Sequence, residues 1–202
     1  MHVFTGATVI RIYGWNNAHD HTLFLDACDS VGLKVLVTYY LGDAKQTPVW
    51  TVEQRNYHIQ QFVEQVNKYR DHPAILMWSF GNELNGSWNG FMTDLSKAAG
   101  CWWQAGCAGY QDTNSDCHWQ ATCVYYQLFH WINSACKAAK VVAPDKPCIS
   151  GMADVDFMVG PTPWLDKVAR FNWILPDVDA WAIQLYRGYT FGGYFVCYTK
   201  LH

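Results

Sequence analysis

The sequence predicts an α/β protein whose parallel sheet forms part of a (β/α)8 barrel. Short apolar and β-branched runs alternate along the chain with segments of helical period. No short turn signal joins two neighbouring apolar runs, as it would in a β-hairpin. Polar residues cluster directly after the apolar runs, and barrel active sites are built from the carboxyl ends of strands.

The first three elements are expected before residue 41. Ala7–Tyr13 is a short β-branched run, which predicts a strand. Asp20 is an N-cap residue for a helix that reaches about Val31, and Gly32 is its stop signal. Leu33–Tyr40 is almost continuously apolar, as expected of a strand that is buried on both faces.

A longer helix and a third strand follow. Apolar residues at helical period predict a helix over Thr51–Arg70, which His72-Pro73 would end. Ala74–Phe80 is the next buried strand. The pattern then becomes more widely spaced, with a loop over 81–90, a short helical piece over 91–99 and a Cys/Gly-rich insertion over 100–117.

The last third of the chain repeats the alternation. We expect a long helix over 118–142, a turn at 144–147 and a brief strand over 148–152. A helical segment over 164–171 and a strand over 180–186 complete the order.

A barrel is favoured over an open doubly wound sheet. The sequence has neither a G-x-G-x-x-G turn nor a P-loop, which would favour the open sheet. Five strands cannot close an eight-stranded barrel. We therefore expect residues 1–202 to form a single, incomplete barrel domain, either a fragment or a truncated gene product.

Composition excludes several classes of protein. The 202 residues are 50% hydrophobic and 15% charged, which is too apolar for a disordered chain. The net charge of −3 is spread along the chain, so we expect no nucleic-acid partner. No apolar run reaches the roughly 18 residues of a membrane span. The histidines lack the spacing of zinc proteases, and the sequence implies no metal or organic cofactor. It does not indicate an oligomeric state.

Four cysteines lie close together in the insertion. Cys101, Cys107, Cys117 and Cys123 have the spacing C-x5-C-x9-C-x5-C, unlike the C-x2-4-C pairs of zinc fingers. We favour two disulfides that close a loop over about 100–123, with free thiols or a metal site as alternatives. Disulfides would favour a secreted or cell-wall location, although the N-terminus does not look like a signal peptide. Cys28 and Cys136 lie on apolar helix faces and are either core thiols or a further bridge.

The strongest chemical motif is Trp78-Ser79-Phe80-Gly81-Asn82-Glu83, an apolar strand that ends in Asn-Glu. A carboxyl group that leaves a buried strand is partly desolvated, and desolvation raises its pKa toward the value a general acid needs. Asn82 beside it can donate an amide N–H to a substrate hydroxyl. The alternative is that Glu83 caps a turn or pairs with Arg11.

Five segments together resemble the clan A glycoside hydrolases, which are retaining (β/α)8 enzymes, from the second barrel strand to the sixth. Within the clan, they are similar to family 2, family 5 and the fungal-type β-1,3-glucanosyltransferases. The segments are Trp78–Glu83, Ile10–Trp15 (IRIYGW), Gly32–Val37 (GLKVLV), Pro144–Gly151 (PDKPCISG) and Asp179–Tyr186 (DAWAIQLY).

The resemblance implies a carbohydrate substrate and a role for each site residue. Glu83 would be the acid/base, and Asn82 would hold the sugar 2-hydroxyl. Arg11 and Tyr186 would orient the nucleophile. The sequence has 11 Trp and 12 Tyr, and Trp15, Trp50 and Trp88 fall in loops where they are either sugar platforms or ordinary packing residues.

The nucleophile of the clan, a Glu after the seventh strand, has no counterpart here. The only other glutamates are Glu53 and Glu64, which we expect to be surface charges on the helix over 51–70. Asp154 could substitute, but a turn or sugar-binding role fits it better. We therefore expect this chain to be inactive alone, with a carbohydrate-binding pseudoenzyme as the alternative. The absence of a G-x-S-x-G nucleophile elbow disfavours an open-sheet hydrolase. The sequence does not indicate which glycan would be the substrate.

Overall fold

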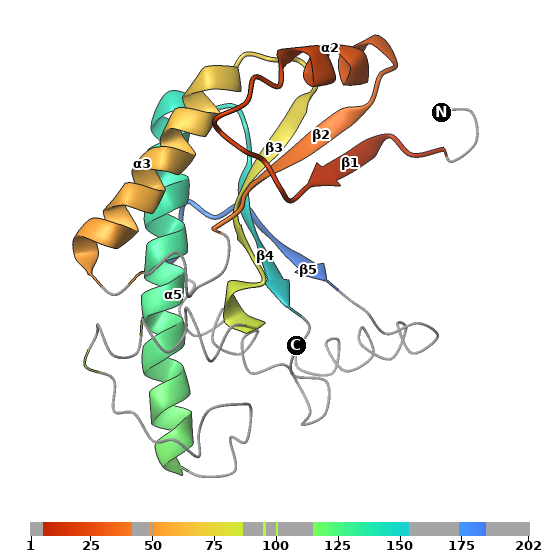
Figure 1. The fold of residues 1–202 in the computed structure, drawn as a ribbon. Helices are drawn as coiled ribbons and strands as arrows, with labels where there is room; N and C mark the ends of the chain where they lie inside the picture. Colours follow the sequence, from red (N-terminus) through yellow and green to blue (C-terminus); the bar gives the residue numbers. More distant parts are fainter. Residues whose placement is uncertain are drawn as a thin grey trace.

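The fold is a five-stranded parallel half-barrel. The computed structural model describes residues 6–41, 49, 51–86, 95, 100, 115–153 and 174–184, with side chains on the last helix from residue 123 onward. All neighbouring strands are parallel, and their order in the sheet is their order in the chain. An open doubly wound sheet would reverse this order part-way, so the predicted partial barrel is confirmed (Figure 1). The strands are β1 (Val9–Ile12), β2 (Lys34–Tyr39), β3 (Ile75–Asn82), β4 (Cys148–Ala153) and β5 (Ala180–Gln184).

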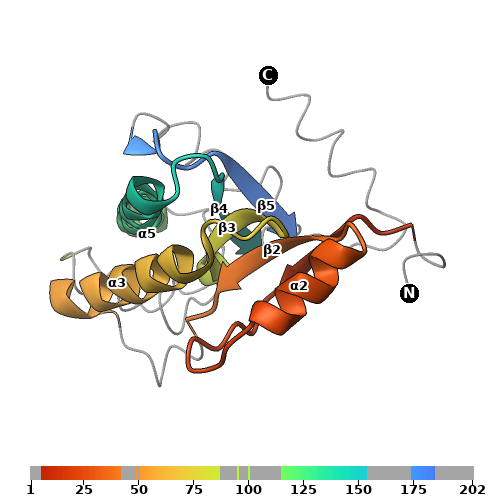
Figure 2. The same ribbon diagram turned by 90° about the horizontal axis from the view of Figure 1, so that it is seen from above.

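Three helices cover one face of the sheet. They are α2 (Thr22–Ser30), α3 (Val52–Tyr69) and α5 (Ser115–Val142), and a single 3-10 turn, η1 (Leu84–Gly86), follows β3. Figures 1 and 2 show all three helices on the same side of the strands. The opposite face is the inner side of the half-barrel.

The alternation of side chains along each strand divides the sheet into two different surfaces. On the helix-facing side, Val37, Trp78 and Phe80 are at most 1% exposed. The Phe80 ring lies 5.3 Å from the Phe62 ring of α3 and 5.1 Å from the Trp131 ring of α5, measured between centroids. This apolar layer fixes the strands beneath the helices, and it leaves the inner face to carry polar side chains.

The helix ends show which local signals were decisive. Thr51, the first residue of the predicted helix, caps α3 by forming a capping box with Gln54. Gly32 ends the segment after α2 with a φ of +70°, which glycine adopts without steric penalty. The prediction that Asp20 is the N-cap was one residue early. The helix begins at Thr22 after His21, and the Asp20 carboxylate accepts both the Thr22 N–H and its hydroxyl.

Other predicted boundaries shift by a few residues. α5 begins at Ser115, so residues 115–117 are helical and not part of the predicted insertion. β3 continues to Asn82, two residues beyond its predicted end, because Asn82 still pairs with Gly151 of β4. The predicted helical pieces over 91–99 and 164–171 lie outside the described residues apart from Leu95, which is helical.

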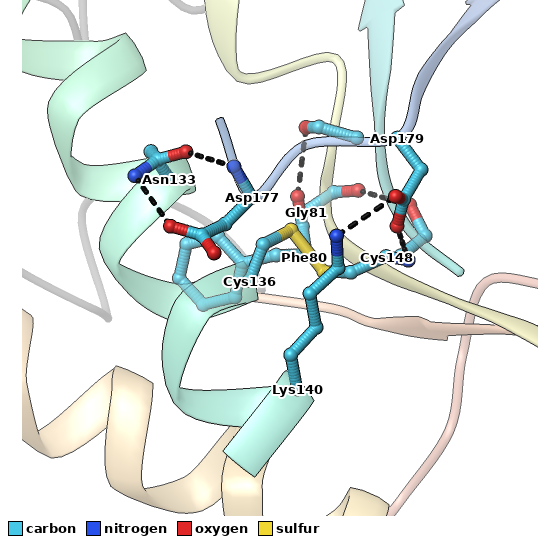
Figure 3. Close-up of a disulfide and its surroundings, with 10 residues drawn as sticks. Phe80, Gly81, Asn133, Cys136, Lys140, Cys148, Asp177 and Asp179 are labelled. Atoms are coloured by element: carbon cyan, nitrogen blue, oxygen red, sulfur yellow. Dashed lines mark hydrogen bonds and ion pairs between the residues drawn. A yellow bond between two sulfur atoms is a disulfide. The ribbon is translucent and has the colours of Figure 1, made fainter. Parts of the chain in front are cut away.

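A disulfide joins α5 to the start of β4. The sulfurs of Cys136 and Cys148 are bonded, which decides for a bridge at Cys136, whereas Cys28 is a buried free thiol. The Cys148 N–H donates to Asp179, which also pairs with Lys140 of α5 at 2.8 Å (Figure 3).

The predicted cysteine cluster is described only at one position. Cys123 is disulfide-bonded, as predicted. The side chains of Cys101, Cys107 and Cys117 lie outside the described residues.

We expect the Cys136–Cys148 bridge to stabilise the fold. Replacing both cysteines with alanine should lower the free energy of unfolding by about 3 kcal/mol, because a closed loop of this size restricts the unfolded chain. Urea denaturation measures the loss. Cys28→Ala is the matched control, since it removes a buried sulfur without opening a loop. Equal losses in the two variants would show that the bridge itself adds nothing.

A buried histidine should make the stability sensitive to acid. His58 of α3 is 5% exposed and hydrogen-bonds through Nδ1 to the Tyr39 hydroxyl, and burial lowers the pKa of its imidazole. Below about pH 6.5 the unfolded state therefore takes up a proton that the folded state resists. We expect the free energy of unfolding to fall as the pH drops through this range, and to fall less in His58→Gln. An unaltered slope in His58→Gln would contradict the assignment.

Candidate active site

An irregularity near the end of β3 turns Asn82 toward the inner face. Side chains alternate along a strand, so Trp78, Phe80 and a regularly placed residue 82 would all face the helices. The pairing between β3 and β4 shifts between Ser79 and Asn82, and Gly81 within this stretch has a φ of +75°. The extra residue changes the side on which the next side chain projects, which is the usual effect of a β-bulge. Asn82 therefore reaches the polar groups of the inner face.

Arg11 is held against Asn82 by the neighbouring strands. Its Nε donates to the Thr38 hydroxyl at 3.2 Å, and its Nη2 donates to Asn82 Oδ1 at 3.0 Å. Gly151 of β4 leaves the necessary space, because a Cβ at this position would collide with the guanidinium. The predicted neighbourhood of Arg11 and the Asn-Glu motif is thus present.

Gln184 connects the far edge of the sheet to the same group. Its Nε2 donates to Asn82 Oδ1 at 2.6 Å, and the Tyr13 hydroxyl lies 3.5 Å from its Oε1. The Arg11 guanidinium lies 4.8 Å from the centre of the Tyr13 ring, a cation–π distance. Side chains from β1, β3 and β5 therefore meet at the carboxyl edge of the sheet.

Glu83 follows directly after β3 in an unusual backbone conformation. Its φ is +52°, which is rare for a residue other than glycine and is often associated with functional sites. Its N–H donates to the Gly151 carbonyl at 2.8 Å, and Glu83 itself is half-buried. Burial raises the pKa of the Glu83 carboxyl, and the charge of Arg11 lowers it by a smaller amount. The net effect is the shift that a general acid needs.

The turn after Glu83 is held in place by hydrogen bonds from a buried asparagine. The Asn85 side chain is fully buried, donates to the Ala153 carbonyl and accepts the Ala153 N–H. This pair of bonds supports a turn role for Asn85. A side chain at Gly81 would meet Leu84 of the same turn.

Not every predicted site residue lies at this edge. Trp15 is only 6% exposed and packs edge-on against Tyr69, with ring centroids 5.5 Å apart, so the packing alternative replaces the sugar platform. The predictions for four further residues lie outside the described part of the chain: Tyr186, Trp50, Trp88 and Asp154. Glu53 and Glu64 are exposed on α3, as predicted.

Three polar residues of the edge were missed by the sequence analysis: Thr38, Tyr13 and Gln184. A signal was available, because Gln184 is the single strongly polar residue of the run Ala180–Tyr186. Period-two alternation also places Tyr13 on the same side as Arg11. The sequence pattern does not show that side chains of β1 and β5, the edge strands of the sheet, meet one another.

Among the residues that the structure describes, no group of three or more His, Cys, Asp or Glu side chains is placed to hold a metal ion. No helix in the same part of the chain has the length and apolar character of a membrane span.

Comparison with known families agrees with this geometry. Residues 15–101 match the family described as glycosyl hydrolases family 2, TIM barrel domain. This range contains the helices and strands from α2 to β3, including Asn82 and Glu83. This part of the chain is thus similar to part of a family 2 glycosyl hydrolase barrel. No curated protein matches it.

Solved structures show the same fold at low sequence identity. The β-glucuronidase 2 of Bacteroides uniformis, covalently bound to cyclophellitol-6-carboxylate aziridine, is 14% identical with a TM-score of 0.62, over 98% of this chain and 20% of that one. A β-galactosidase from the psychrophilic Marinomonas ef1 is 13% identical with a TM-score of 0.54, over 89% and 36% of the two chains. A psychrophilic family 10 endo-β-1,4-xylanase is 15% identical with a TM-score of 0.51, over 88% and 55%. The chain thus spans about a fifth of the length of the glucuronidase.

The carboxyl of Glu83 should titrate at a higher pH than that of Glu53. Burial raises the first pKa, whereas the second is lowered by hydrogen bonds in the first turn of α3. Carbon-13 NMR of the side-chain carboxyls can follow both groups, because the chain has only three glutamates and single Glu→Gln variants assign them. Arg11→Gln should raise the Glu83 pKa further, since it removes the opposing charge. Equal titration of the two groups would contradict the buried placement.

Proposed function

We propose that this barrel segment provides the acid/base side of a retaining β-glycoside hydrolase or transglycosylase that acts on an oligosaccharide or polysaccharide. The observation that carries the proposal is the half-buried Glu83 carboxyl at the inner carboxyl edge of the sheet, with its pKa raised by burial beside Arg11. The family match over residues 15–101 supports the same reaction class. The names of the similar structures, a β-glucuronidase, a β-galactosidase and an endo-β-1,4-xylanase, support a β-glycoside without selecting the sugar.

Glu83 would act twice in such a reaction. Its protonated carboxyl gives a proton to the glycosidic oxygen as the bond to the anomeric carbon breaks, so that the leaving group departs as a neutral alcohol. The carboxylate that remains then takes a proton from water or from an acceptor hydroxyl. The raised pKa favours the protonated form that the first step requires.

Asn82 and Arg11 would serve the other groups of the site. The Asn82 amide presents N–H donors to the sugar 2-hydroxyl. Arg11 would orient a carboxylate nucleophile, which in a retaining enzyme lies about 5–5.5 Å from the acid/base. Tyr186 retains its proposed role beside this nucleophile.

We place the nucleophile outside the three glutamates of this sequence. Glu53 and Glu64 are exposed on the outer helix α3, where Glu64 accepts hydrogen bonds from two neighbouring glutamines. In this proposal the second carboxylate belongs to a longer protein that contains the segment, and the 202-residue chain does not turn over by itself. An extracellular or cell-wall location is proposed as well, because disulfides persist in oxidising compartments.

A carbohydrate-binding role without catalysis is the second candidate. Tyr13 and Tyr40 are 46% and 51% exposed, and both lie just beyond the carboxyl ends of adjacent strands. Their spacing of two residues from Arg11 and Thr38 places them on the inner side. Exposed rings at such positions can stack on sugars whether or not a nucleophile is present.

An external nucleophile can test the proposed acid role in the chain as it is. We expect azide to attack the anomeric carbon of a phenyl β-glycoside, giving a glycosyl azide while Glu83 protonates the departing phenolate. Glu83→Gln should slow this reaction by 10²–10⁴-fold, the usual contribution of a general acid. The loss should be much smaller for a 2,4-dinitrophenyl β-glycoside, because that leaving group departs without a proton. Phenol release and product analysis measure both rates.

Glu64→Gln is the matched control, since it removes a surface carboxyl of the same type. Equal loss with both leaving groups would contradict an acid role for Glu83. Saturable glycoside binding with no azide-dependent reaction would favour the binding candidate. Azide-independent hydrolysis that Glu83→Gln abolishes would show that the nucleophile is present in these 202 residues.

A further inference from the structure

Four side chains form a closed ring of contacts at the carboxyl edge of the sheet. Asn82 Oδ1 accepts from Arg11 Nη2 at 3.0 Å and from Gln184 Nε2 at 2.6 Å. The Tyr13 hydroxyl lies 3.5 Å from Gln184 Oε1, and the Tyr13 ring lies under the Arg11 guanidinium. Gln184 is 9% exposed, so its amide is held away from bulk water.

The two hydrogen bonds to Asn82 define the orientation of its amide. A carbonyl oxygen has two lone pairs, and here one meets a guanidinium N–H and the other meets an amide N–H. Turning the amide by 180° would place its NH2 group against both of these donors. Such a contact between donors is unfavourable, so the NH2 group of Asn82 is left to face a ligand.

Gln184 is itself oriented by its neighbour. An amide can be placed with either its oxygen or its nitrogen toward Asn82. Arg11 has only donors, so it requires Asn82 to present its oxygen, and Gln184 must then present its nitrogen to that oxygen. The oxygen of Gln184 is left to accept from the Tyr13 hydroxyl, which can serve as donor or acceptor.

We propose that Gln184 is a positioning residue that holds the Asn82 amide with its Nδ2 donors toward the substrate. The identity of that substrate as a β-glycoside rests on the proposed function, whereas the positioning does not. Gln184 would thereby improve recognition of the sugar hydroxyl that Asn82 binds without touching the sugar itself.

The positioning can be tested without a ligand. Nitrogen-15 relaxation of the Asn82 side-chain amide should show a rigid group in the wild type and a mobile one in Gln184→Ala. Gln60→Ala, a change of the same type on exposed α3, should leave the Asn82 amide rigid. An Asn82 amide that stays equally rigid in Gln184→Ala would overturn the proposal.

The variant Gln184→Glu makes the mobility of the Asn82 amide depend on pH, which a purely structural role of Gln184 would not produce. At neutral pH its carboxylate cannot donate to Asn82 Oδ1, so the amide should be mobile. On acidification the protonated carboxyl can donate again, and the Asn82 amide should regain its rigidity, which Gln184→Ala should not do. Among the residues that the structure describes, the other ionisable groups at the edge are Arg11, Tyr13 and Glu83, and the wild type at the same pH values controls for Glu83. Absence of this recovery would count against a donor role for Gln184.

A binding measurement separates this proposal from the proposed function. A phenyl β-glycoside should bind the wild type about five to ten times more tightly than its 2-deoxy analogue, the usual effect of one hydrogen bond. Gln184→Ala should reduce this preference to less than twofold, and an unchanged preference would overturn the proposal. If the wild type bound no glycoside while Asn82 still became mobile in Gln184→Ala, the proposed function would fail and the positioning role would stand.

Discussion

The site depends on the irregularity near the end of β3, which moves the Asn82 side chain from the helix-facing side of the sheet to the inner face. A regular strand would direct residue 82 toward α3 and α5, into the layer that Trp78 and Phe80 occupy. The shift in pairing between Ser79 and Asn82 places the Asn82 amide on the inner face, where Arg11 and Gln184 reach its oxygen. Glu83, the next residue, then leaves the strand beside the same group. The positions of both Asn82 and Glu83 thus follow from one local irregularity.

The apolar outer layer stabilises the strand around this irregularity. Phe80 lies at the centre of a cluster of rings from α3, α5 and β2 and is completely buried. Just beyond it, the fully buried Asn85 is bonded to both backbone groups of Ala153. The strained backbone at Glu83 is therefore held between two well-packed points. Strain of this kind persists where the surrounding structure determines the conformation.

At the opposite end of the sheet, the described residues form contacts that stabilise the fold. Asp179 accepts the Cys148 N–H and pairs with Lys140, and Asn133 exchanges two hydrogen bonds with Asp177 (Figure 3). Together with the Cys136–Cys148 bridge, these contacts fasten α5 to the beginnings of β4 and β5. Barrels commonly separate a stabilising end from a catalytic end in this way.

The sequence by itself determined the order of strands and helices, the stop at Gly32 and the Asn-Glu pair at a strand end, since these depend on residues only a few positions apart. It did not determine that Trp15 belongs to the core, or that Cys136 bonds to Cys148. Nor did it reveal that Gln184 reaches Asn82 over 102 positions, or that Arg11 reaches it over 71. Those relations depend on strand register and on the curvature of the sheet, which exist only after the outer layer has packed. The chemistry of the motif is local, whereas its surroundings are a property of the assembled half-barrel.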